Sequence, residues 1–192
     1  MRVAVLMGGY SPEREVSLAS GRAVAKALEQ KGHKVLRIDP ALGPEAEAQQ
    51  VLSPVAIGQE PPSLEELGPD AERQIVRTLE RLPELGVEVV FVALHGGAGE
   101  DGRVQAVLEM IGLPYTGSGP LASALAMRKS FAKALFRQQG VVTPDWLVLP
   151  RAAGVEAERA VQQALGAFAL PFVVKPDNQG STVGFSLVEH AD

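Results

Sequence analysis

The stretch Val3-Ala4-Val5-Leu6-Met7, followed directly by Gly8-Gly9, decides the fold class. Five consecutive apolar residues are typical of a β-strand that is buried on both faces, and the two glycines turn the chain. Apolar residues at helical spacing follow from Val16 to Leu28, and a second strand is expected at residues 35–38. A strand, a helix and a second strand in this order predict a parallel sheet in an α/β fold.

The alternation of helix and strand continues along the first part of the chain. A helix is expected at residues 70–81, a third strand at 87–94, a helix from Arg103 and a short strand at 113–115. We expect these elements to form a Rossmann-like parallel-sheet domain of residues 1–119 that binds substrate.

Two regions depart from this alternation. Residues 40–69 are rich in proline and are expected to form a loop-rich insertion, with one short strand near residues 55–57. In residues 120–192 we expect, in order, two helical pieces at 121–139, a strand at 143–149, a helix at 156–166 and a hairpin at 170–188. This second part is short for a domain, so we expect a partial α+β domain and a chain that is a fragment of a longer protein.

The composition narrows the class of protein. The 192 residues carry a net charge of −5 and include no cysteine. The charge gives no reason to expect nucleic acid or an anionic membrane as a partner, and no apolar run approaches the ~20 residues of a membrane span. Without cysteine there are no disulfides, thiolate nucleophiles or Cys-type zinc sites, which fits a cytoplasmic protein.

Two polar loops follow buried strands, at Gly8–Ser17 and at His95–Gly102. The carboxyl ends of parallel strands meet at one edge of a sheet, so both loops are expected to face the same crevice. Glu13 or Glu15 could hold a substrate ammonium group there through a charge-assisted hydrogen bond. Equally, either carboxylate could simply favour the positive N-terminus of its own helix.

His95 follows an apolar strand and precedes a glycine-rich turn. It could donate a hydrogen bond to substrate or pair with a phosphorylated intermediate, or it could merely cap the strand end. Glu100 and Asp101 are expected in the first turn of the next helix, where they would complement its dipole. No acidic or histidine partner stands at ligand spacing, so no metal site is predicted in this chain.

A phosphate clamp is our hypothesis for Val173–Phe185. Lys175 ends an apolar run, and the loop Gly180-Ser181-Thr182-Val183-Gly184 can offer backbone N–H groups and two hydroxyls to one anion. Lys129, beside Arg128, could add a second cation. The alternatives are an ordinary polar hairpin and a solvated helix face, with Lys175 extending from a sheet edge into solvent. The residue order is not that of a Walker A loop.

Four segments together resemble the D-alanine–D-alanine ligases of the ATP-grasp superfamily. Each is unspecific alone, but they stand in the family's order and spacing. The segments are Gly8-Gly9 with Ser11-Pro12-Glu13-Arg14-Glu15-Val16-Ser17, then Leu94-His95-Gly96-Gly97-Ala98-Gly99-Glu100-Asp101-Gly102, then Gly112–Gly119 with Ala122–Met127 and Lys129, and finally Val174-Lys175-Pro176 with Gly180–Gly184. They cover nearly the whole chain, but only the N-terminal half or so of a family member.

The resemblance implies the amino-acid site and the reaction. Glu13 would anchor the ammonium group of the first D-alanine, and His95 would lie beside the reacting carboxyl group of that substrate. The family phosphorylates this carboxyl group with ATP. The amine of a second D-alanine then attacks the acyl phosphate and forms the dipeptide used in peptidoglycan. Glu13 and Ser181 would be the catalytic residues within this chain.

The resemblance also implies the nucleotide site. Lys129 and Lys175 would hold ATP phosphates. Ser181, with Gly180 and Thr182 in the same loop, would close over these phosphates and connect to the substrate-binding glutamate through hydrogen bonds. Arg128 departs from the family, which usually has an aspartate before this first lysine.

The resemblance leaves part of the machinery outside this chain. The ligands of Mg²⁺, most adenine contacts and the second-substrate site would all lie beyond Asp192, so the 192 residues alone are expected to be inactive. A homodimer through the N-terminal domain is implied. Two alternatives stay open: an ATP-grasp ligase with a different second substrate, and a truncated, non-catalytic relative that acts as a binding or dimerisation module.

Overall fold

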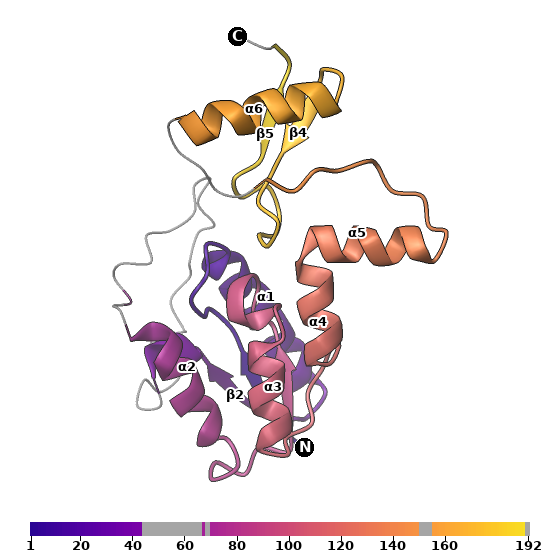
Figure 1. Cartoon of the computed structure of the whole chain (residues 1–192). Helices are drawn as coiled ribbons and strands as arrows, with labels where there is room; N and C mark the ends of the chain where they lie inside the picture. The colour runs from indigo at the N-terminus through magenta and orange to yellow at the C-terminus, as the bar shows by residue number, and fades with distance from the viewer. Residues whose placement is uncertain (44–66, 68–69, 150–154, 191–192) are drawn as a thin grey trace. The chain divides into compact units, whose positions relative to one another are not determined.

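The computed structural model describes residues 1–43, 67, 70–149 and 155–190. The chain forms two compact units, Met1–Ala124 and Leu125–Asp192 (Figure 1). The strand expected near residues 55–57 lies outside the described residues, and the functional domain boundary after residue 119 stays a prediction.

Three parallel strands form the sheet of the first unit. β1 (Arg2–Leu6) lies between β2 (Lys34–Ile38) and β3 (Val89–Val92). Val3 of β1 is opposite the second residue of β2 and the first residue of β3. The order β2-β1-β3 confirms the parallel α/β sheet that the apolar runs predict.

A fourth segment touches this sheet without becoming a strand. The stretch expected as a strand at residues 113–115 makes a single parallel bridge, between Val90 and Tyr115. The Val90 N–H donates to the Pro114 carbonyl at 2.8 Å. Because Pro114 has no N–H of its own, it cannot extend a ladder on the far side, and the sheet ends here.

Helices cover both faces of the sheet (Figure 1). α1 (Arg14–Gln30) packs on the face formed by the odd-numbered side chains of β1, while α2 (Ala71–Glu80) and α3 (Arg103–Met110) pack on the even-numbered face. α1 approaches closely at Gly21, where a Cβ would lie 2.4 Å from the Cβ of Met7. Short 3₁₀ helices follow two strands, η1 (Pro40–Leu42) after β2 and η4 (Gly97–Gly99) after β3.

The second unit is built around an antiparallel hairpin. β4 (Phe172–Val174) pairs with β5 (Ser186–Val188), as the sequence predicts. The helices of this part of the chain are α4 (Pro120–Met127), which spans the division between the units, α5 (Lys129–Gln138) and α6 (Val155–Ala167). None of the helices in the described ranges is long and apolar enough to cross a membrane.

The strand expected at residues 143–149 was a wrong prediction. This stretch forms no strand and pairs with no other strand among the described residues, and Val148 is 56% exposed. Trp146 holds this stretch against α5: the centre of its ring lies 4.4 Å from the guanidinium carbon of Arg137 and 5.4 Å from Lys133 Nζ. Alternating apolar and polar residues are typical of a β-strand. A strand also needs a neighbouring strand to pair with, and the alternation does not show whether one is present.

Candidate functional site

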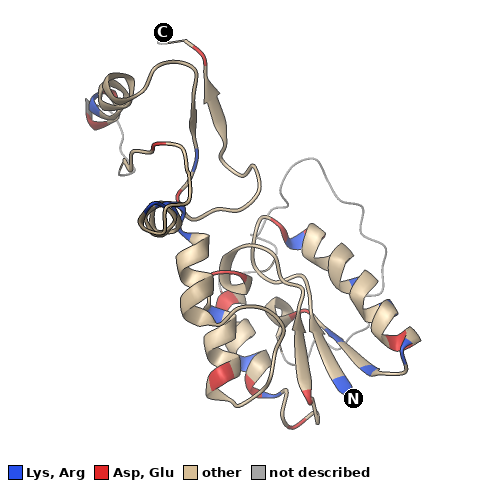
Figure 2. Cartoon of the chain, turned by 90° about the vertical axis from the view of Figure 1, so that its right-hand side faces the viewer, with Lys and Arg blue, Asp and Glu red and all other residues tan. Residues whose placement is uncertain are grey.

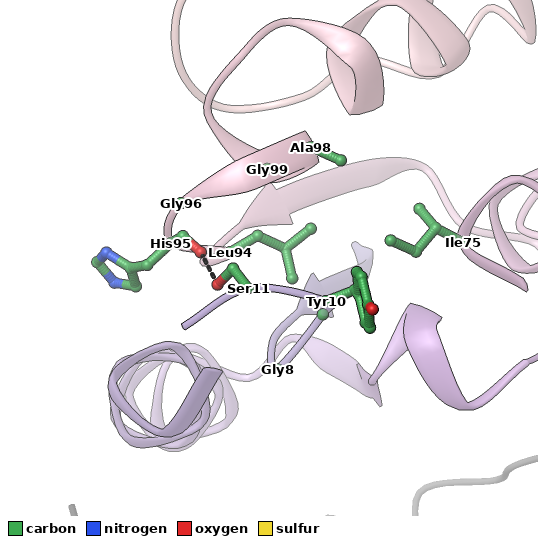
Figure 3. A pocket seen from close by; sticks show the side chains of 10 residues that line it. Gly8, Tyr10, Ser11, Ile75, Leu94, His95, Gly96, Ala98 and Gly99 are labelled. Atoms are coloured by element: carbon green, nitrogen blue, oxygen red, sulfur yellow. Dashed lines mark hydrogen bonds between the residues drawn. The ribbon is translucent and has the colours of Figure 1, made fainter. Parts of the chain in front are cut away.

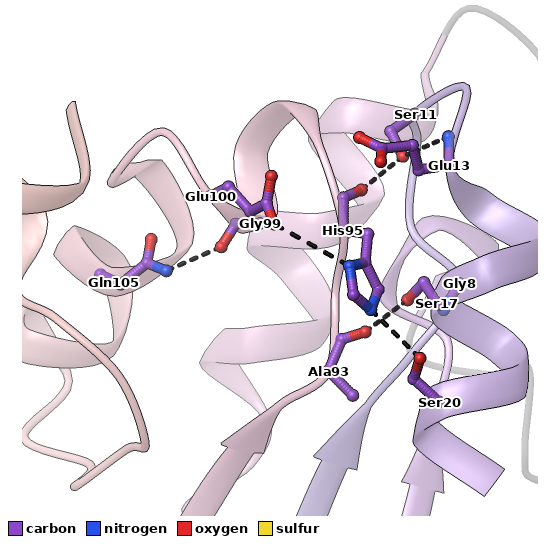
Figure 4. Close-up of polar contacts among 10 residues, drawn as sticks. All are labelled: Gly8, Ser11, Glu13, Ser17, Ser20, Ala93, His95, Gly99, Glu100 and Gln105. Carbon is purple, nitrogen blue, oxygen red and sulfur yellow. Dashed lines mark hydrogen bonds and ion pairs between the residues drawn. The ribbon is translucent and has the colours of Figure 1, made fainter. Parts of the chain in front are cut away.

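Two buried serines join the loops after β1 and β3 at the carboxyl edge of the sheet. Ser17 Oγ accepts a hydrogen bond from the Gly8 N–H (2.8 Å) and donates to the Ala93 carbonyl (2.7 Å). Ser11 Oγ donates to the His95 carbonyl (2.5 Å). Losing either hydroxyl would leave buried polar groups without partners. The two loops that the sequence placed at one crevice therefore lie side by side (Figure 4).

A buried ion pair fixes the turn after β1. The Asp39 side chain, 1% exposed, lies 2.5 Å from Arg14 Nη2 and accepts from the Gly9 N–H at 3.0 Å. Arg14 Nη1 donates to the Gly9 carbonyl at 2.8 Å. Gly8 has φ +81°, and a Cβ there would lie 2.3 Å from Asp39 Oδ2. The position therefore requires glycine, and the turn that leads to Glu13 is held on both sides.

Glu13 lies at the N-cap of α1, facing the loop after β3. Its N–H donates to Ser11 Oγ at 3.2 Å, and its side chain makes no capping hydrogen bond. A Cβ on Gly96 would lie only 2.9 Å from Glu13 Oε2. The carboxylate is thus placed against the neighbouring loop, where it suits either the helix dipole or a bound ammonium group.

His95 reaches from the end of β3 toward α1. Its Nε2 lies 3.2 Å from Ser20 Oγ, and its Nδ1 lies 3.9 Å from Glu100 Oε1 (Figure 4). The side chain is 35% exposed. The ring therefore has polar neighbours at both nitrogens and an accessible edge, and its contact with a substrate stays a prediction.

Glu100 and Asp101 are not in the first turn of α3, contrary to expectation. The N-cap of α3 is Gly102, whose φ of +93° interrupts the helical path. Asp101 Oδ1 accepts from the Arg103 N–H at 3.1 Å and so caps the helix from outside it. Glu100, which follows η4, is left beside His95.

A small pocket lies between the two loops (Figure 3). Its lining includes the main chain of both glycine turns and the side chains of Tyr10, Ile75 and Leu94. In Figure 3 the imidazole of His95 points away from Tyr10 and Ile75. The crevice therefore has an apolar wall on the side of α2, and its polar side chains stand on the side of α1.

In the second unit, the two lysines singled out from the sequence lie near each other. Lys129 is the first residue of α5, and its ammonium group donates to the Gln179 carbonyl in the hairpin loop. Burial and the positive charge of Lys175 lower the pKa of Lys129, while the carboxylate of Asp177 opposes this effect. Lysine and arginine also mark α5 in Figure 2. Cations held this close repel each other, and an anion would relieve that repulsion.

The loop between β4 and β5 turns twice. Ser181 adopts the left-handed conformation (φ +49°), and Gly184 does so at φ +69°. The Phe185 N–H donates to the Thr182 carbonyl at 3.1 Å. Ser181 and Thr182 are exposed, so their hydroxyls are open to a ligand. The roles of these residues and of Gly180, and the connection from Ser181 to Glu13, stay predictions.

The described residues do not fit a divalent metal. Among them, no three histidine, aspartate or glutamate side chains gather as a potential site. Mg²⁺ takes oxygen ligands, chiefly from carboxylates and phosphates. The resemblance implies Mg²⁺ ligands that lie outside this chain.

Three residues that shape the site received no role from the sequence. Ser11 carried a usable signal, because a serine two residues before Glu13 can accept from its backbone N–H. Ser17 and Asp39 carried none, because their partners Ala93 and Arg14 are distant in the sequence. A buried aspartate becomes interpretable only when the cation that pairs with it is known.

Comparison with known families finds two matches. Residues 2–118 match the family described as "D-ala D-ala ligase N-terminus", and residues 135–192 match "D-ala D-ala ligase C-terminus". A curated D-alanine–D-alanine ligase from Synechococcus sp. (strain JA-3-3Ab) is 42% identical over 187 residues, which is 97% of this chain and 47% of the relative. The chain spans about half the length of the curated relatives it matches.

Solved structures give the same result. The D-alanyl-alanine synthetase A of Vibrio cholerae superposes with a TM-score of 0.70 at 25% identity, covering 100% of this chain and 52% of that one. A D-alanine–D-alanine ligase from Bacillus anthracis, complexed with ATP, superposes with a TM-score of 0.61 at 27% identity, covering 99% and 50%.

Proposed function

This chain belongs to the D-alanine–D-alanine ligase family, and we propose that it is the part of an ATP-dependent ligase that binds the first D-alanine and holds the phosphates of ATP. The complete enzyme would join two D-alanines through an acyl phosphate, releasing ADP and phosphate, for peptidoglycan precursor synthesis. The names of the relatives support the amino-acid substrate, and the Bacillus anthracis relative complexed with ATP supports the nucleotide.

One observation carries the nucleotide part of this proposal. The Lys129 ammonium group, at the start of α5, donates to the Gln179 carbonyl in the hairpin loop that follows Lys175, so the helix start and the loop are held together. Burial and then the charge of Lys175 lower the pKa of Lys129, although Asp177 opposes this effect. Two ammonium groups are best held together by a shared polyanion, and triphosphate oxygens offer several acceptors at once. Exposed Ser181 and Thr182 stand in the same hairpin loop, where they would add hydroxyl donors.

The amino-acid part rests on the crevice of the first unit. Glu13 supplies a carboxylate for an ammonium group, and His95 supplies a ring nitrogen within the neighbouring loop. Ser11 and Ser17 hold these loops together. A site of this size and polarity suits a small zwitterion such as D-alanine better than a nucleotide.

The chemistry explains why both parts are needed. A carboxylate is a poor electrophile until phosphorylation converts it into an acyl phosphate, which then reacts with an amine. Cations near the transferred phosphoryl group stabilise the charge that develops in the transition state. An acyl phosphate also hydrolyses in water, so a loop such as Gly180–Gly184 that closes over the phosphates would protect it.

The test is phosphate release by the full-length product of the native gene. We expect release that requires both ATP and D-alanine, with D-alanyl-D-alanine formed in equal amount. The control omits each substrate in turn and replaces D-alanine with L-alanine. An absence of phosphate release with every D-amino acid would contradict the ligase proposal, and a D-alanyl hydroxy acid as product would favour the ligase with a different second substrate.

We also propose that the protein is cytoplasmic and forms a homodimer through its first unit. That unit leaves apolar side chains at its surface, among them Met110 of α3, which is 86% exposed. Sedimentation of the wild-type protein and of Met110→Glu would test the dimer. We expect the wild type to sediment as a dimer, and a monomer at micromolar concentration would contradict it.

A further inference from the structure

Asp177 connects the hairpin loop of the second unit to the first turn of α5. Its Oδ1 accepts from the Ser130 N–H at 2.8 Å, and its Oδ2 accepts from the Ser130 hydroxyl at 3.0 Å. Its backbone carbonyl accepts from the Lys129 N–H at 2.9 Å. A fourth bond joins the Lys129 ammonium to the Gln179 carbonyl. Four hydrogen bonds thus join two consecutive helix residues to a three-residue stretch of the loop.

The start of α5 needs this help from elsewhere in the chain. The N-cap position is occupied by Arg128, in an extended conformation and without a side-chain capping bond. An arginine cannot accept a hydrogen bond, and its positive charge is unfavourable at the positive end of a helix. Asp177 supplies from the hairpin what Arg128 lacks, an acceptor and a negative charge.

The connection also sets the distance between two cations. Lys129 is the residue at which α5 begins, and Lys175 lies two positions before Asp177 in the chain. Their like charges oppose their approach, and the charge of Lys175 adds to burial in lowering the pKa of Lys129. Without the bonds through Asp177, the hairpin loop and the helix would be free to separate and to relieve that repulsion.

We propose that Asp177 is a positioning residue that ties the hairpin loop to α5, so that Lys129 and Lys175 face one anion. The identity of that anion as the phosphates of ATP rests on the proposed function. Asp177 is not expected to touch the anion, since a carboxylate repels it and both carboxylate oxygens already accept hydrogen bonds from Ser130.

A purely electrostatic role for Asp177 predicts the opposite change in ATP affinity from a tether, so one measurement distinguishes them. If Asp177 acted only through its charge, removing that charge near an anion site would tighten ATP binding. A tether predicts weaker binding, because the two lysines would no longer be held in place together. We expect Asp177→Ala to raise the dissociation constant for ATP by about tenfold, and Ser130→Ala, which removes only the hydroxyl bond, by about threefold.

Asp177 could act by capping α5 or by tethering the hairpin loop to α5. A variant that restores the cap without the tether distinguishes these two roles. Arg128→Ser places a neutral capping residue at the N-cap of α5 and adds no bond to the hairpin. In the Asp177→Ala background it should recover the melting temperature but leave ATP binding weak, measured against the single Arg128→Ser variant. Recovery of both would show that Asp177 is only a cap, which would overturn the proposal.

The experiment is calorimetric titration of ATP into the full-length product of the native gene, with thermal unfolding of every variant. Asp145→Ala is the matched control, because this aspartate pairs with Arg137 of the same helix at 2.7 Å and is 83% exposed. It should leave ATP affinity within about twofold of wild type. An Asp177→Ala variant that binds ATP as tightly as wild type, or more tightly, would overturn the proposal.

The same set of measurements separates this inference from the ligase proposal. A wild-type protein that binds ATP but releases no phosphate with D-alanine contradicts the ligase activity and still tests Asp177. An active wild-type enzyme whose Asp177→Ala variant has unchanged ATP affinity contradicts only the role of Asp177. A protein that does not bind ATP contradicts both.

Discussion

The two units of this chain differ most in how far their apolar side chains are buried. In the first unit, helices cover both faces of the sheet, and β1 is buried from Val3 to Leu6. In the second unit, Val173, Val174 and Leu187 of the hairpin are all about half exposed. Among the described residues, Ala164 is the only apolar side chain of the second unit that is buried, and it is still 8% exposed.

This difference indicates where each unit obtains its stability. The first unit forms its own core, so its loops can be held rigidly by buried groups such as Asp39 and Ser17. The second unit relies on local contacts, among them the bonds of Asp177 and the packing of Trp146 on α5. Its exposed apolar faces are suited to packing against further protein.

The largest expected difference concerns independent folding. We expect residues 1–124 alone to unfold in one cooperative thermal transition, because they contain nearly all of the buried apolar side chains. Residues 125–192 alone should show no cooperative transition. Circular dichroism during heating would measure both. A sharp transition in residues 125–192 would mean that burial in the structure is a poor guide to stability here.

The next difference concerns ion pairs. Asp39→Asn leaves the charge of Arg14 without its partner, and we expect a loss of about 3–5 kcal/mol in unfolding free energy. Arg137 and Asp145 form the contrasting pair, with side chains 56% and 83% exposed. Asp145→Asn should cost about 0–1 kcal/mol. Urea denaturation gives both values, and equal costs would remove the distinction between the units.

The smallest difference concerns single leucines. Leu6 is fully buried in β1, so Leu6→Ala should destabilise the protein by about 2–5 kcal/mol. Leu187 in β5 is 53% exposed, and Leu187→Ala should cost about 0.5 kcal/mol or less. Far-UV circular dichroism would follow the secondary structure of both units together, and fluorescence of Trp146, the single tryptophan, would follow the second unit alone. A large cost at Leu187 would indicate that the hairpin face is covered in solution.

The sheet of the first unit could be predicted because its signals are local. A continuous apolar run such as Val3–Met7 already indicates burial on both faces, and Gly8-Gly9 marks where it ends. The hairpin of β4 and β5 was predictable for the same reason, from two apolar runs around a glycine-bounded loop. The stretch 143–149 shows the limit, because no local pattern tells whether a partner strand is present.

The candidate residues could be chosen from the sequence where a reactive side chain stands at the end of an expected strand or the start of an expected helix. Glu13, His95 and Lys175 each follow an apolar run or open a helix, and each carries a group with an obvious use. The groups that hold them in place were not predictable, since Asp39 and Asp177 act through contacts with residues far away in the sequence. Supporting residues of this kind become visible only in three dimensions.

The proposed function divides the substrates between the two units, with the first D-alanine on the first unit and the ATP phosphates on the second. Kinetics of Glu13→Gln and Lys175→Ala in the full-length product would test it most directly. We expect Glu13→Gln to raise KM for the first D-alanine more than KM for ATP. Lys175→Ala should weaken ATP binding by about tenfold or more, as the loss of a charge-assisted phosphate contact predicts, with a smaller effect on D-alanine. Equal changes in both Michaelis constants for both variants would contradict this division of the substrates.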